Sequence, residues 1–338
     1  MARIKDEDYA YATARIRAKE IKLMSRSRLE RLLDTADPSD AMKLLIESGY
    51  GSDHPEIGKG GENDIEMLLS GEMKKAYALL SDILPEPQVL DLFLRQYDYL
   101  NAKLIIKAEF MGIDVSKRLS RLGTLKPEKL LKSIADRKLE ELPEIFGKAI
   151  MDSLEAFSQT GDPQTVDFIL DKAGYENMME DARNAEEPFL IELVKRMTDT
   201  ANIRIFVRAR LLSKSGEFIR SALIPGGSIA EKTLDELAEC TLEQFLEELK
   251  HTDYADLSES LLKAVKHPNG ISEVEKTLDD SILLFLKRSK YVTMGIEPVI
   301  AYLFMKETEI KNARLILTGK INKISQETIK ERLRLGYA

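Results

Sequence analysis

The sequence predicts an all-α protein that contains three similar helical segments. One stretch with helical spacing occurs three times, beginning at Glu86, Glu187 and Glu297. Self-similarity of this kind indicates a repeated architecture. Most of the remaining chain is amphipathic, with apolar residues three or four positions apart, and no run shows the apolar–polar alternation typical of a strand.

The three stretches keep their polar residues at fixed distances when they are aligned on their prolines. An acid follows the proline by eleven residues, an asparagine by fourteen, and bases by eight and by sixteen. The prolines, acids, asparagines and second bases are Pro87, Asp98, Asn101 and Lys103, then Pro188, Asp199, Asn202 and Arg204, then Pro298, Glu309, Asn312 and Arg314. Successive prolines are 101 and 110 residues apart, close to the length of a small domain. We therefore expect three helical domains, at about 1–122, 123–225 and 226–338.

Each repeat should open with proline in the first helical turn, where its missing N–H costs nothing. At about 100° per residue, the acid and the asparagine share a stripe with apolar residues, so they need hydrogen-bond partners. The base at eight can pair with the acid at eleven. The set either fixes the register between helices of different repeats, or brings three acids together around a metal. Each copy offers one carboxylate and no histidine, which favours the structural role.

The same spacing predicts the other elements in order. Asp6–Asp34 is helical and rich in bases, which form a solvated face or contact an acidic partner. Pro38 opens a helix capped by Asp37 or Ser39, the glycine-rich Gly49–Asn63 forms a loop, and Ser228 with Glu231 has capping-box form. The remaining expected helices are Ile65–Leu84, Lys126–Ile134, Leu142–Ser158, Pro163–Ala173, Glu231–Cys240, Leu242–Leu249, Ser258–Val265, Ile271–Ser289 and Glu327–Leu335.

Composition narrows the classes of function. The chain has 338 residues and a net charge of -8, which argues against nucleic-acid binding by electrostatics. Cys240 is the only cysteine, so an intrachain disulfide and a thiolate zinc site are excluded, and a reducing compartment fits. The start lacks the apolar stretch of a signal peptide, and no run approaches the roughly 18 apolar residues of a membrane span. Work at a membrane would therefore require a partner.

No motif predicts catalysis. His54, His251 and His267 are isolated, and neither Gly58-Lys59 nor Gly319-Lys320 has the context of a phosphate-binding loop. Asp279-Asp280 suggests an alternative, a magnesium-dependent helical enzyme, although such a site would want a second acidic cluster. A generic helical scaffold is a third hypothesis. The sequence thus predicts no catalytic residue, no cofactor and no metal site.

Several stretches resemble the C subunit of the A-type/V-type ATP synthases, the relative of the d subunit in eukaryotic V-ATPases. They are YAYATARIRA, EPQVLDLFLRQYDYLNAK, MTDTANIRIFVRARLL and, most specific, EPVIAYLFMKETEIKNARLILTGKIN followed by IKERL and Tyr337. Leu142–Tyr175 matches only as generic helix.

The resemblance implies a funnel of three helical domains around a pseudo-threefold axis. Such proteins cap the membrane proteolipid rotor ring, receive the D and F subunits of the central shaft, and transmit torque without binding nucleotide, nucleic acid or a small-molecule substrate. It implies a peripheral location on the cytoplasmic face of the cell membrane. We expect the turns at Gly123-Thr124 and Gly226-Gly227 to lie near a partner surface.

Overall fold

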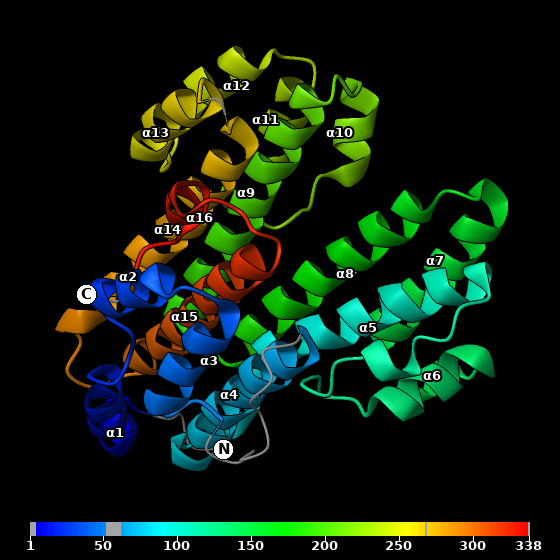
Figure 1. Ribbon diagram of the computed structural model, residues 1–338. Coiled ribbons are helices and arrows are strands. Elements are labelled where there is room, and N and C mark those ends of the chain that lie inside the picture. The colour runs from blue at the N-terminus through cyan, green and yellow to red at the C-terminus, as the bar shows by residue number, and fades with distance from the viewer. Residues whose placement is uncertain (1–4, 52–61, 268, 337–338) are drawn as a thin grey trace. The chain divides into compact units, whose positions relative to one another are not determined.

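The chain is all-α, as the sequence predicts. The structure, a computed structural model, describes residues 5–51, 62–267 and 269–336, and these residues form helices and turns without a strand (Figure 1). They divide into two compact units, one made of Met1–Pro87 with Asp256–Ala338 and the other of Gln88–Ala255. The first unit therefore joins the N-terminal segment to the third repeat, and the second unit holds the first two repeats. The division into three domains remains a prediction.

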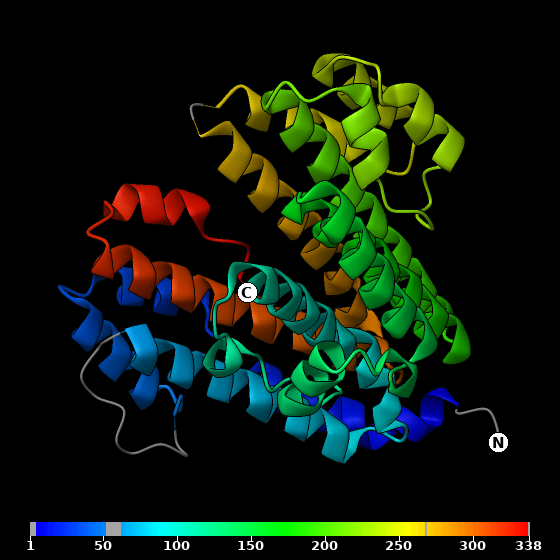
Figure 2. The ribbon, with the colours of Figure 1, turned by 90° about the vertical axis from the view of Figure 1, so that its right-hand side faces the viewer.

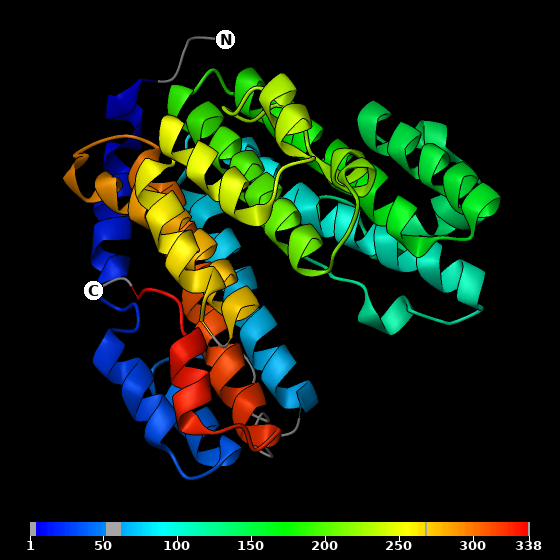
Figure 3. The ribbon, with the colours of Figure 1, turned by 90° about the horizontal axis from the view of Figure 1, so that it is seen from above.

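The first unit is organised around its longest helix. Its helices are α1 (Ala10–Glu20), α2 (Arg26–Asp34), α3 (Pro38–Glu47), α4 (Glu62–Ile83), α13 (Ala255–Val265, whose first residue belongs to the second unit), α14 (Gly270–Lys287), α15 (Glu297–Ile321) and α16 (Gln326–Arg332), with 3-10 turns at Asp6–Tyr9 and Arg288–Tyr291. The third repeat is α15, and it contacts α1, α2, α3, α4, α14 and α16. Figure 2 shows α16 on one side of α15 and the blue N-terminal helices on the other, and Figure 3 shows α14 beside α15.

The position of α15 follows from its sequence. Apolar residues lie on all sides of this helix, and fifteen of its residues are buried. A helix that is hydrophobic all round is stable only when other elements cover it on every side. The surrounding helices are amphipathic and turn one face inward, as α2 does with Leu29, Leu32 and Leu33. The N-terminal segment is thus part of the shell that buries the third repeat.

The second unit places both of its repeat helices against α8. Its helices are α5 (Asp91–Met111), α6 (Pro127–Ala135), α7 (Glu144–Thr160), α8 (Pro163–Asn184), α9 (Pro188–Leu211), α10 (Gly216–Ala222), α11 (Glu231–Leu237) and α12 (Leu242–Glu248), with 3-10 turns at Pro87–Leu90, Ser116–Arg118, Leu139–Glu141 and Leu249–His251. Helices α5 and α9, from the first and second repeats, each pack on α8, and α8 also packs on α7. A core around α5 includes an edge-to-face pair between Tyr99 and Phe146 with ring centroids 4.7 Å apart. Phe206 of α9 stacks on Phe245 of α12 at 3.7 Å.

Three local predictions were wrong. The expected helix over residues 6–34 breaks at residues 21–25, where Ser25 caps α2. Helix α8 extends eleven residues beyond the expected end at Ala173, because its buried face continues through Met178 and Ala182. Ser228 does not cap α11, whose N-cap residue is Ala230. The expected cap of α3 is confirmed at Asp37, which accepts a hydrogen bond from the Asp40 N–H at 2.9 Å.

Candidate functional site

Each repeat asparagine holds the backbone of a later segment through two hydrogen bonds. The Asn202 amide nitrogen donates to the Ile224 carbonyl, and the Ile224 N–H donates to the Asn202 oxygen, both at 2.8 Å. Asn101 makes the same pair with Ser120, both bonds at 2.8 Å. Asn312 makes it with Arg334, at 3.2 and 2.9 Å. All three asparagines are buried, so each side chain takes the place of a backbone partner.

The spacing from asparagine to bound segment differs in the first repeat. It is 19 residues there and 22 in the other two. The intervening chain explains the difference. In the second and third repeats it forms the seven-residue helices α10 and α16, whereas in the first it forms the three-residue 3-10 turn Ser116–Arg118. The contact is thus preserved while the connecting helix is shortened.

The first two repeat acids bind the turn that follows this segment. Asp98 accepts from the Thr124 N–H at 2.9 Å, the Thr124 hydroxyl at 2.7 Å and the Leu125 N–H at 3.1 Å. Burial raises the pKa of Asp98, and these hydrogen bonds from Thr124 and Leu125 oppose the rise. The carboxylate therefore satisfies backbone groups of a turn that has no partner in a helix.

Asp199 repeats this arrangement in the second repeat. It accepts from the Ser228 N–H at 2.8 Å and the Ile229 N–H at 3.2 Å, and also from the Ser228 hydroxyl. The Tyr254 hydroxyl adds a fourth bond at 2.7 Å. Burial, followed by the charge of Asp199, raises the pKa of Tyr254. This phenol therefore remains a donor to the carboxylate at physiological pH.

A glycine precedes both bound turns for a steric reason. A Cβ atom built on Gly123 would lie 2.0 Å from an Asp98 oxygen, and one built on Gly227 would lie 2.0 Å from an Asp199 oxygen. Any larger residue must displace the carboxylate or the turn. Sequence reasoning found these glycines only as turn residues, although their matching positions relative to the acids signal the contact.

The third acid has different partners. Glu309 accepts from the Tyr50 hydroxyl at 2.5 Å and from the Met24 N–H, and Lys306 pairs with it at 2.7 Å. Burial, followed by the Glu309 charge, raises the pKa of Tyr50 well above its ordinary value. The turn positions that match those of the second repeat would be residues 337 and 338, which lie outside the described residues. The N-terminal segment thus supplies the donors that the following turn supplies elsewhere.

The repeat bases bind carboxylates of neighbouring elements. Lys306 pairs with Glu309 as the spacing predicts, whereas Arg95 donates to Asp181 on α8 at 2.7 Å. The other bonds are Arg196 to Glu192, Lys103 to Asp171, and Arg314 to both oxygens of Glu66. Burial raises the pKa of Tyr175 to about 12, and the nearby Arg204 opposes the rise. Pro188 is the first residue of α9, Pro298 the second of α15, and Pro87 opens the 3-10 turn before α5.

The repeat polar set therefore binds mainly within its own unit and along its own chain segment. We expected it to set the register between helices of different repeats, and the contacts instead hold the loops that follow each repeat helix. Among the described residues, no three histidine, cysteine or acidic side chains are placed to hold a metal ion. His251 and His267 are exposed, and His54 lies outside the described residues.

The Asp279-Asp280 pair holds the segment that follows α16. Arg334 donates to Asp279 from Nε at 3.1 Å, and the Leu335 N–H donates to Asp280 at 2.7 Å. Burial raises the pKa of Asp280 to about 6. Both carboxylates of the proposed magnesium site are thus engaged by the chain itself.

The second Gly-Lys dipeptide also has a structural partner. Lys320 donates from Nζ to the Leu33 carbonyl at 2.7 Å and to the Thr35 carbonyl, which lie at the end of α2. A cation at a helix C-terminus satisfies carbonyls that have no partner within the helix. Gly58-Lys59 lies outside the described residues. Within the described part of the chain, no helix combines the length and the apolar composition that crossing a bilayer requires.

Comparison with known proteins identifies the family. A family model described as ATP synthase (C/AC39) subunit matches residues 12–332. The C subunit of the V-type sodium ATPase of Enterococcus hirae is 29% identical over 324 residues, which cover 95% of this chain and 97% of that protein. The C subunit of the A-type ATP synthase of Methanocaldococcus jannaschii is 27% identical, covering 96% and 86%, and that of Thermococcus kodakarensis is 25% identical, covering 96% and 89%. The chain belongs to the ATP synthase C/AC39 subunit family.

Proposed function

We propose that this chain is a non-catalytic central-stalk subunit of an A-type or V-type rotary ATP synthase. In this role it couples the membrane proteolipid rotor ring to the D and F subunits of the central shaft, and so links ion transport to ATP synthesis or hydrolysis. It would lie on the cytoplasmic face of the cell membrane, held there by the complex. The observation that carries the proposal is similarity along nearly the whole chain to proteins named as the C subunit of A-type and V-type ATPases.

The packing of the chain suits a mechanical role. Helices α5, α9 and α15 have 21, 24 and 25 residues, which corresponds to lengths of about 30–38 Å. Buried polar side chains tie the loop after each of them to the same helix. Close-packed interiors have low compressibility and transmit strain. A protein that carries torque needs this stiffness more than it needs a reactive group.

We also propose that the turns at Gly123-Thr124 and Gly227-Ser228 contact a neighbouring protein of the complex. Asp98 and Asp199 hold these turns in one conformation before any partner binds. A preorganised contact loses less conformational entropy on association than a mobile loop does.

Reconstitution tests the proposed function. Vesicles carrying the membrane ring are combined with the shaft and the nucleotide-hydrolysing head, with and without this chain. We expect the chain to co-purify with the tagged ring, and ATP-driven ion uptake to require it. Ion uptake of equal rate without the chain, or a chain that stays alone in solution when the complex is intact, would contradict the proposal.

A further inference from the structure

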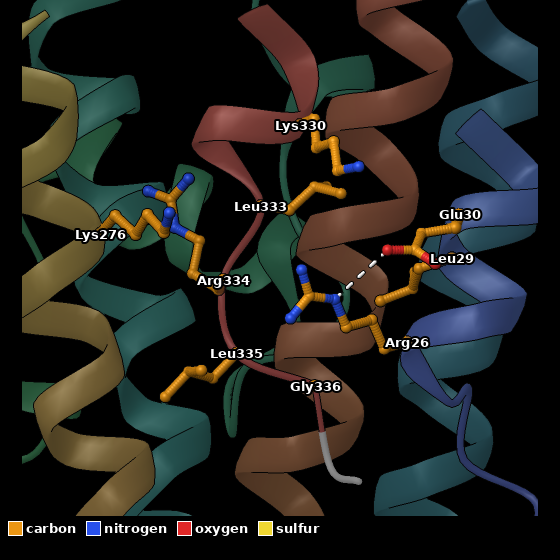
Figure 4. A pocket seen from close by; sticks show the side chains of 9 residues that line it. All are labelled: Arg26, Leu29, Glu30, Lys276, Lys330, Leu333, Arg334, Leu335 and Gly336. Atoms are coloured by element: carbon orange, nitrogen blue, oxygen red, sulfur yellow. Dashed lines mark hydrogen bonds and ion pairs between the residues drawn. The ribbon is translucent and has the colours of Figure 1, made fainter. Parts of the chain in front are cut away.

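A pocket of about 190 Å³ opens in the first unit beside the segment that follows α16 (Figure 4). Helices α2 and α14 and residues 330–336 form its walls, and four cationic side chains line it against one carboxylate. This excess of positive charge occurs on a protein whose net charge is -8. The pocket thus concentrates a positive potential that the molecule as a whole does not have.

Two of the four cations are committed to the chain itself. Arg334 donates from Nε to Asp279 at 3.1 Å and from Nη1 to the Arg332 carbonyl at 2.9 Å. Lys276 donates to the Glu331 carbonyl at 2.8 Å. In Figure 4 both lie on the α14 side of the C-terminal segment. They contribute charge to the pocket, and their geometry is already fixed.

The other two cations keep donors available for a ligand. Arg26 pairs with Glu30 at 3.3 Å through Nε, which leaves its two terminal nitrogens without a bond to any described residue. No described residue accepts a hydrogen bond from the Lys330 ammonium or pairs with it. Figure 4 shows both side chains extending between α2 and the C-terminal segment, beside Leu29 and Leu333. Anionic and apolar groups of a ligand would therefore meet their partners in the same opening.

This combination decides the class of ligand. Inorganic phosphate is small and fully hydrated, so it gains nothing from the leucines. A peptide that presents a carboxylate next to an apolar side chain uses both features, because the ion pairs fix orientation and the apolar contact adds buried area. The volume suits one or two such side chains rather than a folded element.

We propose that this pocket docks an acidic segment of a protein partner, with a carboxylate on Arg26 and Lys330 and an apolar side chain against Leu29 and Leu333. The bound segment would bridge α2 and the residues after α16, and so tie the N-terminal and C-terminal parts of the first unit together. This inference does not depend on the proposed function.

Fluorescence anisotropy with the full chain tests the proposal. The probe is a labelled glycine–serine peptide that carries two glutamates flanking one leucine, and its matched control has glutamines in place of the glutamates. We expect at least tenfold tighter binding of the acidic peptide, and a tenfold loss in the Arg26→Gln/Lys330→Gln variant. The control variant Lys43→Gln/Lys311→Gln removes the same charge away from the pocket and should bind as the parent does.

Further arms separate this ligand from other anions. Leu333→Ser should weaken the peptide fivefold or more, and 10 mM phosphate should not displace it; far-UV circular dichroism checks that each variant is folded. Equal binding of both peptides, or unchanged binding in the Arg26→Gln/Lys330→Gln variant, would overturn the proposal. So would displacement by phosphate, or tighter binding to vesicles containing anionic phospholipid than to the acidic peptide.

Discussion

At the scale of the residue, an asparagine side chain can replace a peptide group, because it carries one carbonyl acceptor and an N–H donor in the same plane. Asn101, Asn202 and Asn312 all use both groups on a single backbone residue. The bound residue lies in an irregular segment that no helix or sheet satisfies. A buried loop of this kind is stable only when such side chains provide its partners.

Asn202→Leu should therefore lower the free energy of unfolding by about 1–3 kcal/mol, because it leaves the Ile224 N–H and carbonyl buried without partners. Urea denaturation followed by circular dichroism measures the change. The exposed Asn322→Leu serves as the control and should differ little from the parent. Equal stability of the two variants would remove the proposed role of Asn202.

Gly227→Ala should destabilise the second unit by about 1–3 kcal/mol, since the new Cβ atom meets the Asp199 carboxylate. Gly174→Ala is the matched control. Its Cβ would lie 3.5 Å from the Tyr99 ring, an ordinary contact, and alanine favours the helix. A double variant with Asp199→Ala should recover part of the loss caused by alanine at 227. Strictly additive losses would show that the contact is not the cause.

At the scale of the element, the three repeat helices end in the same way despite different residues. Gly112, Ser213 and Lys323 each lie 25 residues after the repeat proline, and their φ angles are +65°, +54° and +54°. In each case the next N–H bonds a carbonyl five residues earlier, at 2.9, 2.8 and 2.9 Å. This is the bonding of a Schellman C-cap. Only the first repeat has the residue that this conformation favours, which is why the sequence did not reveal the shared end.

Ser213→Gly should raise the melting temperature, because it removes a left-handed strain of about 1 kcal/mol from a non-glycine residue. Ser221→Gly, at an exposed position inside α10, should lower stability by about 1 kcal/mol through lost helix propensity. Thermal unfolding of the two variants should thus shift in opposite directions. Two shifts of the same sign would contradict the assignment of Ser213 as a strained cap.

The contact between α14 and the C-terminal segment should depend on pH through Asp280. Burial raises the pKa of Asp280 to about 6, above the value near 4 of an unfolded aspartate. Between these values the folded chain binds more protons than the unfolded chain, so stability falls as pH rises from about 4 to 6. Asp280→Asn should remove this part of the slope, worth about 1–3 kcal/mol. Urea midpoints of both proteins from pH 4 to 7 measure the difference, and parallel profiles would contradict it.

At the scale of the whole molecule, the ends of the chain build one unit and the middle builds the other. The first unit needs both ends, because α15 is buried by α1–α4 as well as by α14 and α16. Glu309 reinforces this closure by binding the Met24 N–H and the Tyr50 hydroxyl. The second unit is continuous in sequence and has its own core.

A fragment of residues 88–255 should consequently fold alone and unfold cooperatively, whereas a fragment that ends at residue 255 should lose the structure of its first 87 residues. Circular dichroism and limited proteolysis distinguish the two outcomes. A non-cooperative melt of the 88–255 fragment would show that the second unit needs the first.

The sequence by itself determined the helical class, the threefold repeat and the family. These depend on periodicity and on matching positions, which are properties of the order of residues. Tertiary structure alone decided what each repeat polar group binds. Asp199 meets Tyr254 from 55 residues away and Glu309 meets Tyr50 from 259 residues away, and no local pattern marks these partners. A buried carboxylate requires donors but does not specify their source, so the folded chain selects whichever donors its packing brings within reach.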